Sequence, residues 1–114
     1  MSCQLVYHEE RPATPQPGDC WPAPYIVAPG EDRNWYVEHW LSPEYVRDWL
    51  DKRPPIIVRL PDGAEWCIDQ RATDNDRGWT VTGEPPHLTA NPSVASSGYH
   101  GWLRDGVLIL ILVL

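Results

Sequence analysis

The sequence predicts a mostly β domain of the α+β class, with a small antiparallel sheet or open barrel of about five to seven short strands and one helix. Three observations lead to this prediction. From Ile56 onward, short β-branched or alternating runs are separated by turn residues. Only one stretch, about 42–52, repeats apolar side chains at helical spacing. Six of the 13 prolines crowd into residues 11–29 and argue against a helix there.

Residues 1–33 predict an extended, proline-rich arm that begins with a short strand at residues 4–7. Because proline lacks a backbone donor and fixes φ, we expect the proline-rich stretch to be neither helix nor central strand. Trp21 and Tyr25 are expected to hold the arm against the body of the domain by burying apolar surface.

Residues 34–53 predict the helical segment. Ser42 is a good N-cap, and Pro43 suits the first helical position. The helix over 42–52 then carries one apolar stripe, made of Tyr45, Val46, Trp49 and Leu50. Pro54 and the proline after it end the helix.

Residues 54–114 predict the β-rich core. The β-branched run 56–60 and the alternating run 65–69 are separated by Pro-Asp-Gly, which favours a hairpin turn. Asp105 and Gly106 lie between two further apolar runs, and an Asp-Gly pair in that position predicts a second hairpin.

The length of 114 residues fits a single domain covering residues 1–114. Sixteen acidic side chains against nine basic ones give a net charge of −7. Nucleic acid is therefore not an expected partner, because its affinity for proteins comes largely from Lys and Arg that neutralise phosphates. An anionic membrane surface is disfavoured for the same reason.

Cysteine usage and hydropathy bear on the compartment. Cys3, Cys20 and Cys67 are an odd set without short spacing, so we expect a reducing compartment and no disulfide framework. No basic region followed by an apolar one is found near residue 1, so no signal peptide is expected. The apolar run 107–114 is shorter than the ~20 residues of a membrane-spanning helix, so no membrane span is expected.

The run 107–114 is nonetheless the most unusual feature of the sequence, because it contains no polar residue. A central strand buried on both faces would account for its first half. Its last four residues extend beyond any plausible hairpin partner and are expected to contact a partner protein or a second copy by strand addition. These assembly candidates are Ile111, Leu112, Val113 and Leu114.

Other sites have weaker support. Cys67, His87 and His100 could converge as a residual site, which would suit a zinc- or Cys-dependent hydrolase. Zinc ligands usually come in closely spaced pairs, and no such pair occurs, so neither a metal nor another cofactor is expected and no catalytic residue is assigned. Exposed tryptophans could instead form a carbohydrate-binding platform, although most of the seven are expected in the core.

The C-terminal half carries a resemblance. The segments Trp79–Thr89, Asn91–Val94 and Tyr99–Gly106 resemble a small domain-of-unknown-function family of bacteria and of phages that infect GC-rich hosts. Bacterial members of that family carry a cysteine cluster after the first strand, which suggests zinc. Here the corresponding segment, Leu60–Cys67, has one cysteine. The resemblance therefore implies a phage-type member that has lost its metal ligands, located in the host cytoplasm or in a virion.

Together these features predict a non-catalytic module that acts through protein contacts or self-association, as a virion component or a host-directed phage protein. The apolar run and the aromatic residues of the arm, Trp21 and Tyr25, are the expected contact elements.

Removing the last four residues tests the assembly role of the apolar run. The intact chain is expected to self-associate, and a chain ending at Leu110 to do so less, because four apolar side chains no longer need shielding from water. Analytical ultracentrifugation of both proteins measures this. Two equally monomeric and soluble proteins would show that the tail has no such role.

Overall fold

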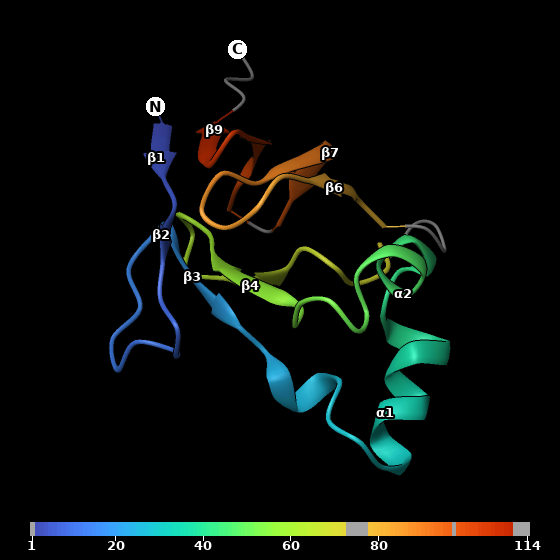
Figure 1. The fold of residues 1–114 in the computed structure, drawn as a ribbon. Coiled ribbons are helices and arrows are strands. Elements are labelled where there is room, and N and C mark those ends of the chain that lie inside the picture. Colours follow the sequence, from blue (N-terminus) through green and yellow to red (C-terminus); the bar gives the residue numbers. More distant parts are fainter. Residues whose placement is uncertain (1, 73–77, 97, 111–114) are drawn as a thin grey trace.

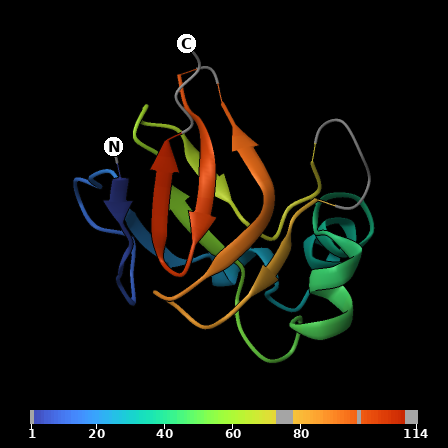
Figure 2. The same ribbon diagram turned by 90° about the horizontal axis from the view of Figure 1, so that it is seen from above.

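The computed structural model describes residues 2–72, 78–96 and 98–110, in which nine strands form two sheets that face each other (Figures 1 and 2). One sheet is antiparallel and has the order β1 (Ser2–Gln4), β9 (Val107–Leu110), β8 (His100–Arg104), β7 (Thr89–Ala95) and β6 (Thr80–Thr82). The other has the order β2 (Val6–Tyr7), β3 (Asp19–Pro22), β4 (Ile56–Arg59) and β5 (Glu65–Cys67). The architecture is a two-layered sandwich that does not close into a barrel.

The first strands of the chain join the two sheets. Ser2 in β1 pairs with Ile109 in β9, and four residues later Val6 in β2 pairs in parallel with Asp19 in β3. Between them, buried Leu5 donates its backbone N–H to the carbonyl of Gly106 at 2.7 Å. One short segment therefore contributes an edge strand to each layer.

The main core lies between the layers. Side chains alternate along β4, so Ile56 and Val58 point into this core and Ile57 points to the opposite face of the sheet. The larger core residues come from both sheets and from the connections between them: Leu5, Leu60, Trp66, Ile68, Leu88, Tyr99, Leu103 and Leu108. Burial of these side chains supplies most of the free energy that holds the layers together.

The helical segment packs beside the four-stranded sheet, against Ile57 on its outer face (Figure 1). A short 3₁₀ turn, Pro24–Ile26, leads into α1 (Glu31–Trp35), which continues as a π-helical turn (Tyr36–Trp40). Helix α2 (Pro43–Asp48) follows after a break at Leu41 and Ser42. A second, smaller core forms here around Ala23, Ile26, Leu41 and Tyr45.

The structure confirms the predicted fold class, a mostly β domain whose strands pair antiparallel except for β2 with β3, with a helix within 42–52. The Ser42 side chain caps α2 by accepting a hydrogen bond from Tyr45 N, with Pro43 in the first turn. The Asp-Gly hairpin is also present: Asp105 and Gly106 join β8 to β9 with φ of 46° and 77°.

The proline-rich arm is a correction. It was expected to contain no central strand, yet β3 lies between β2 and β4 inside the four-stranded sheet. Proline is tolerated because Pro22 is the last residue of the strand, and Ala23 N makes the next bond, to Pro55 O at 2.8 Å. Strands β1, β2 and β3 thus come from residues 1–33, which raises the number of strands above the expected five to seven.

The helical segment also begins earlier than expected, at Glu31 instead of residue 34. In its first part the Tyr36 ring contacts both Trp35 and Trp40, and Tyr36, Val37 and Trp40 pack against the second core. None of the helices in the described residues is long and apolar enough to cross a membrane.

Strand β9 lies between β1 and β8, which agrees with an internal strand for the first half of the apolar run. Leu108 is 1% exposed, whereas its neighbour Ile109 is 40% exposed. The assembly candidates Ile111 to Leu114 lie outside the described residues, so their role stays a prediction.

Two neighbouring substitutions test this orientation of β9. Leu108→Ala is expected to lower the free energy of unfolding by about 2–5 kcal/mol, because it leaves a cavity in the main core. Ile109→Ala is expected to cost clearly less, because that side chain is partly in water. Urea unfolding of both variants measures the difference. Equal losses would show that the strand is buried on both faces in solution.

Candidate functional site

A groove lies on the outer face of the four-stranded sheet. Two hollows, of about 210 and 330 Å³, share Tyr25, Ile57 and Glu65 as lining residues. Because aromatic side chains line both, we call this feature the aromatic groove. The remaining aromatic members are Trp21, Tyr36 and Trp40.

Strand register explains the floor of the groove. Trp21 in β3 pairs with Ile57 in β4, which pairs with Cys67 in β5. Side chains of paired residues lie on the same face, so these three form one row across the sheet. Trp21 and Cys67 are 2% and 4% exposed, which makes the floor closed and well packed.

Tyr25 stands between the two hollows and is the most exposed large apolar side chain in the described residues, at 65%. It belongs to the short 3₁₀ turn that Pro24 opens. Partial burial raises the pKa of Tyr25, and nearby Cys67, Tyr36 and Glu65 raise it further. At neutral pH the hydroxyl is therefore protonated and can donate a hydrogen bond to a ligand.

The helical segment forms one wall. Tyr36 and Trp40 contact edge to face with ring centroids 5.6 Å apart, and both line the smaller hollow. Trp40 is tied to the sheet side by its carbonyl, which accepts a hydrogen bond from Arg71 N at 2.8 Å. The Arg71 side chain also donates to Leu41 O at 3.0 Å.

Charged side chains from the arm and from strand β5 form the other wall. Arg11 donates from Nε to Glu65 Oε1 at 3.2 Å, and its guanidinium carbon lies 5.5 Å from the centroid of the Trp21 ring. Arg59 Nη2 lies 3.8 Å from the other Glu65 oxygen. Glu9 and Glu10 line the same hollow, are exposed, and have no ion pair within residues 2–72, 78–96 and 98–110.

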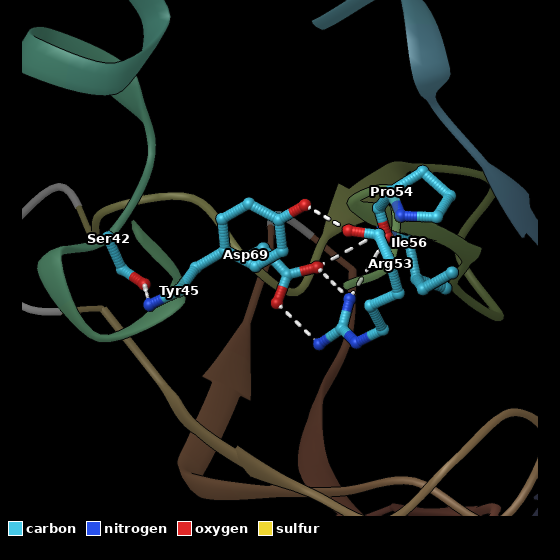
Figure 3. A network of polar contacts seen from close by, with 6 residues as sticks. All are labelled: Ser42, Tyr45, Arg53, Pro54, Ile56 and Asp69. Carbon is cyan, nitrogen blue, oxygen red and sulfur yellow. Dashed lines mark hydrogen bonds and ion pairs between the residues drawn. The ribbon is translucent and has the colours of Figure 1, made fainter. Parts of the chain in front are cut away.

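A buried ion pair fixes the helical wall relative to the sheet (Figure 3). The two terminal nitrogens of Arg53 donate to the two oxygens of Asp69 at 2.8 and 2.9 Å. Asp69 Oδ2 also accepts from Ile56 N at 3.0 Å. Asp69 is 1% exposed, so its charge is neutralised inside the protein by this geometry.

Helix α2 is attached to the same pair. Tyr45 donates its hydroxyl proton to Arg53 O, and the Arg53 guanidinium lies over the rings of Tyr45 and Trp49 at 5.4 and 5.0 Å. Ser42 N donates to Asp69 O at 2.8 Å. Both Asp69 side-chain oxygens accept hydrogen bonds and are shielded from water. The pair therefore stabilises the fold and offers no free oxygen to a ligand.

The structure places the predicted residual site as follows. Cys67 is buried in β5 under the groove, and burial raises the pKa of its thiol. His100 belongs to β8 of the other sheet, where Nε2 lies 3.2 Å from Ser93 Oγ. His87 is largely exposed and lies 3.7 Å from Asp105. Across the described ranges, no three His, Cys, Asp or Glu side chains form a group that could hold a metal ion.

Trp21 and Tyr25 were both expected to hold the arm by burial: Trp21 is buried in the floor of the groove, but Tyr25 is 65% exposed, so that expectation is wrong for Tyr25. The tryptophans do not form an exposed row. All seven lie in the described residues, and Trp35, at 53%, is the single one that is exposed. Sequence reasoning missed Arg11, Glu65 and the Arg53–Asp69 pair, because their partners are distant along the chain and no local motif marks them.

Asp69→Asn tests the role of the buried pair. It is expected to lower the free energy of unfolding by about 3–5 kcal/mol, because the Arg53 charge stays buried without its partner. Asp48→Asn removes an exposed partner of Arg47 and serves as the matched control, with a much smaller expected effect. Chemical denaturation measures both. Similar losses would mean that the Arg53–Asp69 pair contributes no more than a surface contact.

Comparison of the chain with protein-family models, with curated proteins and with solved structures finds no match. The resemblance of its C-terminal half to a phage-type domain family accordingly remains a prediction.

Proposed function

We propose that this chain is a non-catalytic protein-interaction module and that the aromatic groove is its binding surface. The observation that carries the proposal is Tyr25, whose exposed ring lies between two hollows lined by further aromatic side chains. Tyr and Trp are the side chains most enriched among residues that dominate binding energy at protein interfaces.

The rigidity of the groove supports the proposal. Its floor is a row of paired strand residues, its helical wall is bonded to Arg71, and the Arg53–Asp69 pair holds α2, which follows that wall. A surface that is already ordered loses little conformational entropy when a partner binds. Tyr25, on its short turn, combines a large apolar area with a hydroxyl donor, which suits recognition of a peptide backbone.

The chemistry of the groove favours binding over catalysis. Cys67 lies beneath it, but the raised pKa of this thiol keeps it protonated at neutral pH, and a thiolate is the reactive form. Asp69, the buried carboxylate nearby, has both oxygens engaged. These observations weigh against the Cys-dependent hydrolase considered from the sequence.

A carbohydrate platform is less well supported, because stacking on a sugar needs an exposed aromatic face, and Trp35 alone among the tryptophans offers one. Assembly through Ile111–Leu114 is a separate part of the proposal and depends on the ultracentrifugation comparison described above. The phage-type resemblance suggests a partner in a virion or in a host cell.

Tyr25→Ala tests the proposal. A random-peptide library panned on the folded wild-type chain is expected to enrich peptides whose affinity falls about tenfold or more in this variant, because the exposed ring is lost from the centre of the groove. Isothermal titration calorimetry of synthesised peptides measures the change. Tyr7→Ala, which removes another exposed ring that does not line the groove, is the control and should bind normally.

Tyr25 is exposed, so its substitution is expected to leave thermal stability nearly unchanged, and a melting curve checks this. Selected peptides that bind Tyr25→Ala as well as they bind the wild type would contradict the proposal, as would a failure of the library to enrich any sequence.

A further inference from the structure

We infer that the aromatic groove recognises an arginine side chain on an extended segment of the partner, and that Arg11 occupies the arginine position in the free protein. This inference rests on the proposed function and adds the chemistry of the ligand. It begins from the contacts that Arg11 itself makes.

The position of Arg11 has the features of a guanidinium-binding site. One face of its guanidinium lies over the Trp21 ring, and Nε donates to the Glu65 carboxylate. An aromatic face combined with a carboxylate is a common way for proteins to hold an arginine. Arg59, 3.8 Å from the second Glu65 oxygen, helps to hold that carboxylate in place.

Arg11 is bound weakly enough to be replaced. Its side chain is 50% exposed and that of Glu65 is 39% exposed, and ion pairs in such settings stabilise proteins little. Within the described residues, Nε is the one nitrogen of Arg11 that donates a hydrogen bond to a side chain. A ligand arginine that approached Glu65 with two nitrogens would make the stronger, bidentate contact.

The surrounding charge favours a cationic ligand. Glu9, Glu10 and Glu65 line the larger hollow with Arg11, while Arg59 lies near Glu65 without lining the hollow. When Arg11 moves away, three acidic residues line the hollow and Arg59 is the one cation in the described residues that pairs with any of them, so the excess negative charge attracts a cation from the partner. An acidic or phosphorylated segment would be repelled, both here and by the overall charge of −7.

Two features select arginine and an extended backbone. The flat guanidinium can stack on Trp21 and bond Glu65 at the same time, whereas the compact lysine ammonium cannot do both equally well. The groove continues from this hollow past Tyr25 to Tyr36 and Trp40, so residues beside the arginine would meet aromatic rings. A turn or helix would reach fewer of them.

Opposite effects of two substitutions test the inference. The probe is a capped peptide of alternating Ala and Pro with one central Arg, and its twins carry Lys or citrulline instead. Arg11→Ala is expected to raise the affinity for the Arg peptide about threefold or more, because the site is no longer occupied. Glu65→Gln is expected to lower it about tenfold, because the charged acceptor is lost.

Glu84→Gln is the matched control, because it removes an exposed carboxylate outside the groove. This variant should bind the Arg peptide with the same affinity as the wild type. Titrations followed by the ¹⁵N NMR signal of the Trp21 indole give the affinities and report directly on the site. The Lys and citrulline twins are expected to bind at least several-fold more weakly.

Glu65→Gln also loses the contact with Arg59 and could bind less because it is less stable. The affinity of Arg11→Ala does not depend on that contact, so this variant alone decides the inference. Unchanged or weaker binding to Arg11→Ala would overturn the inference, as would equal affinity for the citrulline twin. If library peptides depend on Tyr25 but the Arg peptide does not bind, the inference fails while the proposed function stands. If the library peptides bind Tyr25→Ala as tightly as the wild type, the proposed function fails instead.

Discussion

The relation between helix and sheet in this protein depends on one buried ion pair, Arg53 with Asp69. Asp69 follows β5, and Arg53 precedes the prolines that lead into β4, so the pair joins both ends of the β4–β5 hairpin. Through Tyr45 and Ser42 it also holds α2. Burying two charges costs free energy unless their hydrogen bonds are satisfied, and this geometry largely satisfies them, which favours one arrangement of α2 beside the four-stranded sheet.

That constraint helps to shape the outer face of the four-stranded sheet, which carries the aromatic groove. Helical residues could pack on Ile57 in several ways if only apolar contacts held them. The directed bonds of Arg53 select one of these, and the aromatic groove keeps its shape as a result. The groove is consequently a product of two kinds of interaction: apolar burial supplies its floor, and polar contacts set the position of its wall.

Local signals in the sequence were sufficient for some elements and not for others. Helix α2 and the Asp105–Gly106 hairpin were predictable because capping, proline position and turn chemistry act over a few residues. Strand β3 was not, because it depends on β4 and on Gly18, where a side chain would meet Gln4 O at 2.5 Å. For the site, Trp21 and Tyr25 were identified from their bulk and their place in the arm. Arg11 and Glu65 are 54 residues apart, and their meeting follows from tertiary structure alone.

The pairing of β1 with β9 has a consequence for how the protein is made. Ser2 pairs with Ile109, so β1 has no partner strand until synthesis has reached β9, more than a hundred residues later. Until then its neighbour β2 can already add to β3, once Asp19 and Cys20 have emerged. The strands of the four-stranded layer are thus all available before β9 is made, whereas the five-stranded layer needs a contact between segments far apart in sequence, which is slow to form.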